Sequence, residues 1–169
     1  MKRTLAALGL ALPLALNAQA ADKVKIGFIS TLSGPSAALG VDIRDAFNLA
    51  VKLNGGKLGG LPAEIIVGDD QFKPEVGKQL AEKNIKLDRV DFLTGIVFSN
   101  IMLASVPEAF ANKVIYISPN AAPSPLAGAQ CNPYFFAVSW PNDAYHEACL
   151  LYTSPSPRDR TRSRMPSSA

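Results

Sequence analysis

The sequence is poor in the side chains that most often carry catalysis or bind metal. Its 169 residues include one histidine, two cysteines and one tryptophan. It contains no G-x-S-x-G nucleophile turn, no G-x-x-x-x-G-K-[ST] phosphate loop and no H-E-x-x-H zinc motif. We therefore expect no catalytic residues, no metal site and no cofactor.

A surplus of positive charge is also missing from the body of the chain. Between Ala21 and Ala148, 11 basic side chains are set against 13 acidic ones. A nucleic-acid-binding surface needs clustered positive charge, so the composition argues against nucleic acid as a partner. The hydrophobic content of 48% is typical of a chain that forms a globular core.

The chain begins with an apolar run that is too short to span a bilayer comfortably. Two basic residues precede the run Leu5–Leu16, and the small-x-small sequence Ala18-Gln19-Ala20 follows it. This order predicts a signal peptide over residues 1–20 and an exported mature chain that starts at Ala21. A buried N-terminal helix is the alternative, but it leaves the order of basic, apolar and small residues unexplained.

The last residues differ from the rest of the chain. Serine, proline and arginine dominate residues 149–169, and the stretches "CLLYTSPSPRD" and "SRMPSSA" resemble the translated ends of a transposase-type sequencing adapter. We therefore expect residues 149–169 to be a disordered assembly artefact and residues 21–148 to be an incomplete natural lobe. A natural disordered tail is the alternative.

Between these ends, strand patterns alternate with helix patterns. The strands are predicted over residues 24–30, 61–68, 90–98 and 113–119, and the helices over 37–54, 73–87 and 99–112. The glycines of "GGKLGG" indicate a turn rather than a phosphate loop, because they follow a helix. This alternation predicts an α/β fold of three layers, with a parallel sheet covered on both faces.

The helical periodicity also predicts which side chains face the sheet. The first helix should bury Leu39, Ile43, Phe47, Ala50 and Val51, and the second Val76, Leu80, Ala81 and Ile85. Pro107 should kink or shorten the third helix.

Ligands of such sheets bind at the carboxyl ends of the strands, so the loops there are the candidate site. Ser99 and Asn100 open a helix directly after the third strand, where unpaired N–H groups suit a carboxylate. The alternative is that Ser99 is only an N-cap. Asp69 and Asp70 are more consistent with a structural, capping role than with metal binding or acid–base catalysis, because adjacent strand residues point to opposite faces.

Four segments carry a family resemblance: "KIGFISTLSGPSAALG", "IIVGDDQFKP", "DFLTGIVFSN" and "VIYISPNAAPSPLAG". In this order and spacing they resemble the N-terminal lobe of the periplasmic solute-binding proteins of branched-chain amino-acid (Leu/Ile/Val-type) ABC importers, over Lys23 to Glu147. The resemblance implies one lobe of a type I periplasmic binding protein whose second lobe is missing. It also implies a periplasmic location, a small carboxylate solute, an inner-membrane ABC permease as partner, and a monomer at full length.

The resemblance assigns roles to residues of two loops. It places the ligand carboxylate at Ser99 and Asn100, and the carboxylate and α-amino contacts at Asn120, Ala121 and Ala122. Ala122 stands where leucine binders commonly have a threonine that helps to bind the amine. Both ligand classes therefore stay open, a branched-chain or other amino acid and an aromatic or other organic acid. The weaker binding candidates are Ser33, Trp140 and Tyr145. For Trp140 and Tyr145 ordinary packing is an equal alternative, and His146 is expected at the surface.

The resemblance also bears on the cysteines. Leucine binders often join the loops after the second and third strands by a cystine, and the matching positions here are Phe72 and Phe98. That bridge is therefore absent. Cys131 either pairs with a residue beyond the present chain or is buried and free.

Three classes of function follow. The first is the solute-binding component of an ABC importer, and the alternative is a periplasmic ligand sensor with the same lobe fold. An exported α/β enzyme is less consistent with the sequence, because the strand ends supply no nucleophile or general base.

Overall fold

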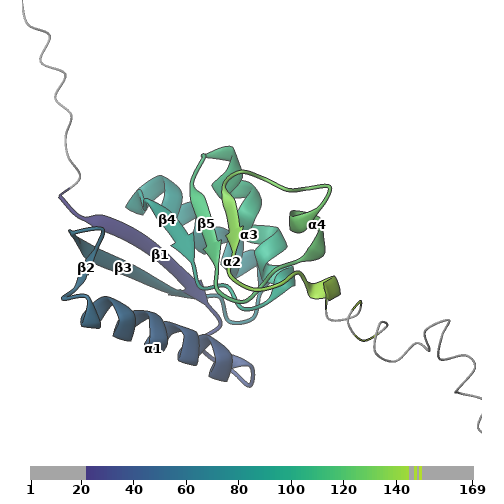
Figure 1. The fold of residues 1–169 in the computed structure, drawn as a ribbon, viewed down its shortest axis with the longest axis horizontal. Coiled ribbons are helices and arrows are strands. Elements are labelled where there is room, and N and C mark those ends of the chain that lie inside the picture. Colours follow the sequence, from purple (N-terminus) through teal and green to yellow (C-terminus); the bar gives the residue numbers. More distant parts are fainter. Residues whose placement is uncertain (1–21, 145–146, 148, 150–169) are drawn as a thin grey trace, which may run out of the picture.

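A six-stranded sheet forms the centre of the computed structural model, which describes residues 22–144, 147 and 149. The strand order is β2-β3-β1-β4-β5-β6, and all neighbours are parallel except β2 and β3 (Figure 1). The strands are β1 (Val24–Ser30), β2 (Lys57–Leu58), β3 (Leu61–Asp69), β4 (Phe92–Thr94), β5 (Ile115–Ser118) and β6 (Phe135–Ala137).

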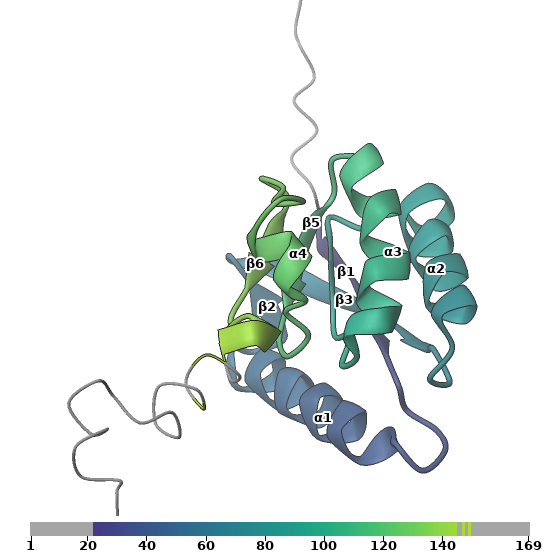
Figure 2. The same ribbon diagram turned by 90° about the vertical axis from the view of Figure 1, so that its right-hand side faces the viewer.

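Helices cover both faces of the sheet. Helix α1 lies on one face, and α2 and α3 pack side by side on the other (Figure 2). The helices are α1 (Ala37–Leu53), α2 (Pro74–Lys83), its π-helical extension η1 (Asn84–Asp88), α3 (Ser99–Ala111) and the short α4 (Ser124–Ala127). The predicted three-layer α/β fold with a mainly parallel sheet is confirmed.

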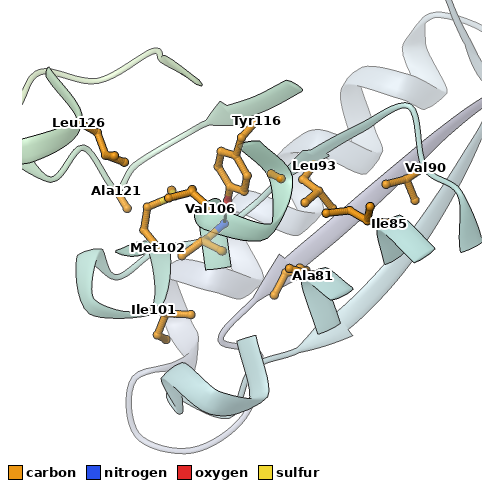
Figure 3. Packing of buried hydrophobic residues seen from close by; sticks show 13 residues of the cluster. Ala81, Ile85, Val90, Leu93, Ile101, Met102, Val106, Tyr116, Ala121 and Leu126 are labelled. Atoms are coloured by element: carbon orange, nitrogen blue, oxygen red, sulfur yellow. Dashed lines mark hydrogen bonds between the residues drawn. The ribbon is translucent and has the colours of Figure 1, made fainter. Parts of the chain in front are cut away.

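The main core lies between the sheet and the layer of α2 and α3 (Figure 3). Leu93 and Tyr116 from the strands meet Ala81 of α2 and Ile101 of α3, all fully buried. The predicted inner face of α2 is confirmed, since Ala81 and Ile85 are buried and Val76 and Leu80 are half-buried. Burial of several large side chains, each worth about 1.5–3 kcal/mol, makes this layer the main source of stability.

The opposite face is only half covered. Phe47 of α1 packs on Phe28 of β1 with ring centroids 5.6 Å apart. Val67 of β3 and Phe136 of β6 lie level with Phe28 across the paired strands and so point to the same face. Val67 is 46% exposed and Phe136 is 52% exposed. Helix α1 therefore covers the middle of this face and leaves Val67 of β3 and Phe136 of β6 largely open to solvent.

The prediction for the inner face of α1 is accordingly only partly right. Val51 is buried, and Ile43 and Phe47 are half-buried. Leu39 and Ala50 are exposed, which the periodicity did not predict. The reason is that a single helix on an open sheet face has no neighbouring helix to cover its sides.

Two local predictions need correction. The third strand ends at Thr94 rather than at residue 98, because the next residue, Gly95, has a φ of +105° that breaks the extended backbone. Of the two effects predicted for Pro107, shortening is wrong, because α3 continues to Ala111, and a kink stays a prediction. The carbonyl that Pro107 leaves without an N–H donor belongs to Leu103, whose exposed position allows water to replace that bond.

The "GGKLGG" segment forms the predicted turn and also adds strand β2. Lys57 and Leu58 pair with the start of β3, and Gly59 and Gly60 between them have positive φ angles. Neither β2 nor β6 is predicted by the sequence pattern. Two-residue and three-residue strands are too short to show a period, so they are not visible in a hydrophobic pattern.

Two predictions concern parts of the chain outside the described residues. These are the signal peptide over residues 1–20 and the artefact over residues 149–169, of which only Cys149 is described. Within the described part of the chain, no helix has both the length and the apolar character needed to cross a membrane.

The close contact of α1 with the sheet generates a stability prediction. A methyl group at Gly40 would lie 2.0 Å from the carbonyl oxygen of Thr31. We expect Gly40→Ala to lower the free energy of unfolding by about 1–3 kcal/mol, although alanine is the better helix former. Urea denaturation measures the change. Ala38→Gly, at an exposed position two residues earlier in α1, is the control and should cost about 1 kcal/mol from propensity alone. A Gly40→Ala variant that is more stable than the wild type would contradict the packing argument.

Candidate functional site

The predicted binding residues lie at the edge of the sheet where its parallel strands end. Ser99 and Asn100 follow β4, and Asn120, Ala121 and Ala122 follow the neighbouring strand β5. Because β4 and β5 are parallel, both loops leave the sheet at the same edge. Figure 1 shows the two strands side by side.

The connection from β4 to α3 is fixed by main-chain contacts with both neighbouring strands. A Cβ at Gly95 would lie 2.6 Å from the carbonyl oxygen of Ile29 in β1, so only glycine fits. The hydroxyl of Ser30 donates to the carbonyl oxygen of Gly95 at 3.0 Å. The N–H of Ile96 donates to Oη of Tyr116 in β5, also at 3.0 Å. These contacts set where α3 begins.

Helix α3 begins at Ser99 without a side-chain cap. The N-cap residue is Phe98, which is extended, and no side chain accepts a capping hydrogen bond there. The N–H of Met102 donates to the Phe98 carbonyl oxygen at 3.0 Å, so the N–H groups of residues 99–101 precede the helical ladder. The interpretation of Ser99 as an N-cap is therefore wrong. Ser99 is half-buried and Asn100 is exposed.

Asn120 ties the two loops together. Its Nδ2 donates to the carbonyl oxygen of Val97 at 2.9 Å, and the residue is half-buried. Ala121 and Ala122 are buried, and the carbonyl oxygen of Ala121 accepts the hydroxyl of Ser118. The methyl groups of the two alanines thus face the protein interior. Alanine has no polar side-chain atom, and the carbonyl oxygens of both residues already accept hydrogen bonds from Ser118 and Asn142, so only their main-chain N–H groups could reach a ligand.

Sequence reasoning missed Asn142. Its Nδ2 donates to Oγ of Ser99 at 2.8 Å, across 43 positions of the sequence. Its main-chain N–H donates to the carbonyl oxygen of Ala122 at 2.9 Å. A single asparagine outside the predicted strands and helices gives no periodic or motif signal, so only the fold could reveal this contact.

Asp69 and Asp70 hold loops together rather than cap α2, whose N-cap is Lys73. Asp69 accepts the N–H groups of Leu32 and Gln71, each at 2.9 Å. Asp70 is fully buried and accepts the hydroxyl of Thr31 at 2.5 Å and the N–H of Phe72 at 2.9 Å. The structural role expected for both aspartates is supported, but they act by hydrogen-bonding neighbouring loops to each other and not by capping a helix.

The two carboxyl groups have opposite pKa shifts. Burial raises the pKa of Asp70 above the ordinary 3.8, against the hydrogen bonds from Thr31 and Phe72, and the charge of Asp69 acts in the same direction as burial. Burial also works to raise the pKa of Asp69. There, hydrogen bonds from the Ser33 side chain and from main-chain N–H groups outweigh it and hold the pKa below 3.8.

The weaker candidates are not assembled into a site. Ser33 is exposed and its hydroxyl bonds the Asp69 carboxylate, while Trp140 is 63% exposed. Tyr145 and His146 lie outside the described residues.

The positions implied for the missing cystine hold an aromatic pair. Phe72 and Phe98 meet edge to face with ring centroids 4.6 Å apart, so the two loops that a cystine would join are in contact. Cys131 is exposed, which corrects the expectation of a buried thiol, and it forms no disulfide with a described residue.

Other chemistry is not supported in the described part of the chain. No group of three or more His, Cys, Asp or Glu side chains there could hold a metal ion. A surface groove on α2 and η1 is lined by Gln79, Glu82, Lys83, Lys86 and Leu87. Its lysines are already paired, Lys83 with Asp88 at 2.6 Å and Lys86 with Glu108 at 2.8 Å. This groove lies on the helix layer rather than at the loops that follow β4 and β5.

The adjacent aspartates generate a pH prediction with opposite signs. A raised folded-state pKa at Asp70 means that ionisation costs stability. We therefore expect the wild type to lose free energy of unfolding relative to Asp70→Asn as pH rises above 3.8. Asp69 is the control, because its lowered pKa makes the wild type lose stability relative to Asp69→Asn as pH falls below 3.8. Urea denaturation from about pH 3 to 7 measures both differences. If the free energy of unfolding of the wild type rose relative to that of Asp70→Asn with increasing pH, the assigned direction of the pKa shift would be wrong.

Solved structures of solute-binding proteins share this fold. One from an ABC transporter of R. palustris, in complex with benzoate, has a TM-score of 0.70 and 31% identity, covering 77% of this chain and 37% of that one. Another, from Rhodopseudomonas palustris BisB5 in complex with 3,4-dihydroxybenzoic acid, has a TM-score of 0.66 and 31% identity, covering 71% of this chain and 32% of that one.

Curated sequences agree with the structures. The Leu/Ile/Val-binding protein homolog 6 of Brucella abortus (strain 2308) is 30% identical over 128 residues, which are 75% of this chain and 32% of that protein. The chain thus spans about a third of the length of the curated relatives it matches. The family resemblance predicted from the four loop segments is confirmed. The sequence profile of the periplasmic binding protein family matches residues 23–155, and the chain belongs to that family.

Proposed function

We propose that this chain is one lobe of the extracytoplasmic solute-binding component of an ABC importer. The complete protein would be a periplasmic monomer that binds a small carboxylate between two lobes and delivers it to an inner-membrane permease. Family membership and the solute-binding proteins among the relatives support this proposal. The chain spans about a third of its curated relatives, which agrees with a single lobe.

The start of α3 is the observation that carries the carboxylate site. The first-turn N–H groups of α3 lie outside the helical ladder, at the carboxyl edge of the sheet. A carboxylate there would accept these N–H groups and the hydroxyl of Ser99. The helix dipole would add about 0.3–1 kcal/mol.

The other predicted residues would support this arrangement in different ways. Asn100 would contribute its N–H, whereas Asn120 would act by holding the β5–α4 loop against Val97. Ala121 and Ala122 have no polar side-chain atom and are almost fully buried in this lobe, so their contribution would be limited to main-chain N–H groups. Ser33, Trp140 and Tyr145 stay weaker candidates.

The ligand class follows from the groups that this lobe presents. An amino-acid ligand needs acceptors for its ammonium group, and Ala122 supplies no side-chain oxygen. The nearby carboxylates of Asp69 and Asp70 accept loop N–H and hydroxyl groups, and Oδ2 of Asp70, which has no hydrogen-bond partner among the described residues, is buried. These features, with the aromatic acids bound by two solved relatives, favour an aromatic or other organic acid over an amino acid.

Removal of the Ser99 hydroxyl tests the site. We expect Ser99→Ala to weaken binding of the carboxylic acid by roughly five- to a hundred-fold, or about 1–3 kcal/mol, because one charge-assisted hydrogen bond is lost. Calorimetry on the longest protein that the source locus encodes measures the acid and its uncharged amide. The wild type should strongly prefer the acid. Ser105→Ala is the matched control, since its hydroxyl bonds the Ile101 carbonyl oxygen within the same helix.

Equal acid affinity in Ser99→Ala and the wild type would show that the carboxylate binds elsewhere. The same result at Ser105→Ala, by contrast, is expected. Permease and ATPase genes beside the source locus would separate an importer component from a sensor.

A further inference from the structure

We propose that Asn142 is a positioning residue that fixes the Ser99 hydroxyl as a hydrogen-bond donor toward the ligand carboxylate. The inference rests on the proposed carboxylate site. Its basis is the bond from Nδ2 of Asn142 to Oγ of Ser99, 2.8 Å long, at the first residue of α3.

The bond determines the direction in which the Ser99 hydroxyl can donate its proton. A serine hydroxyl has one proton and two lone pairs, and Asn142 donates to one of the lone pairs. The proton of Ser99 must therefore point to a different acceptor. The first-turn N–H groups cannot accept it, and the carbonyl oxygens of Gly95, Val97 and Phe98 already accept other donors. The hydroxyl proton is thus held ready for a carboxylate oxygen.

This polarity also selects against a cation at the same place. With the hydroxyl proton directed outward, Ser99 and the first-turn N–H groups all present donors. A carboxylate accepts from all of them, whereas a ligand ammonium would meet these donors with only the second lone pair of the Ser99 oxygen as an acceptor. Asn142 therefore contributes to specificity without touching the ligand.

The position of Asn142 does not depend on its side chain. Its main-chain N–H donates to the Ala122 carbonyl oxygen at 2.9 Å, and the next residue, Asp143, donates its N–H to Oγ of Ser124 at 3.1 Å. Asn142 is exposed, so substitution creates no cavity. Variants at this position can therefore change the hydroxyl polarity while the segment stays attached.

A double-mutant cycle separates polarity from other effects. Asn142→Ala and Asn142→Asp are made in the wild type and in Ser99→Ala, in the longest protein that the source locus encodes. The probes are benzoate with benzamide and leucine with leucinamide, and the pair whose acid binds more tightly is followed by calorimetry. Asn48→Asp, an exposed position on α1, is the matched control for added charge.

We expect Asn142→Ala to weaken acid binding about two- to ten-fold in the wild type, because the hydroxyl is freed to rotate. The same change should have less than about a two-fold effect in Ser99→Ala, where no hydroxyl is left to orient. Asn142→Asp should weaken acid binding more than about ten-fold, since aspartate accepts the Ser99 proton and adds a negative charge. In the Ser99→Ala background, Asn142→Asp should weaken acid binding less, because only the effect of the added negative charge remains. Amide binding and the control should be nearly unchanged.

Two outcomes overturn the inference, and they differ from failure of the proposed site. If Asn142→Ala weakens acid and amide equally, or is equally harmful with and without Ser99, its role is structural. If the wild type does not prefer the acid and Ser99→Ala has no effect, the proposed carboxylate site itself is wrong and the inference falls with it.

Discussion

The path of the main chain at Gly95 and Ile96 is the constraint on which the candidate site depends. Gly95 passes so close to the Ile29 carbonyl oxygen that no side chain fits, and Ile96 is held by the buried hydroxyl of Tyr116. These contacts use β1 and β5, the two neighbours of β4, to end the strand and start α3. Because the loop is fixed from both sides, its N–H groups need no side-chain cap to be ordered.

Sequence patterns predicted the alternation of elements, the parallel sheet and the beginning of α3 at Ser99, because each long element buries a periodic apolar face. They failed where the deciding contact was distant. The capping role of Ser99 was wrong because Phe98 occupies the N-cap position, and Asn142 was missed because its partner is far away in the sequence. The exposure of Leu39 was not predicted because it results from the absence of a helix packed beside α1, which periodicity does not reveal.

The half-covered face of the sheet and the candidate site lie in different parts of the molecule. The open sheet positions such as Val67 and Phe136 lie on the face of α1, whereas the loops with Ser99 and Asn120 lie at the carboxyl edge. Stability therefore comes mainly from the layer of α2 and α3, which also carries the helix start. A change in that packing should reach the site through α3, while a change on the α1 face should affect stability first.

The central claim is that a carboxylate binds at the start of α3, and NMR on the ¹⁵N-labelled chain tests it most directly. Titration with benzoate should give weak binding, on the order of millimolar, because one lobe offers only part of a cleft. The account predicts that the largest amide shifts occur in residues 99–101 and 120–122, with benzamide giving little change. Shifts concentrated at the groove of residues 79–87, or equal responses to benzoate and benzamide, would contradict it.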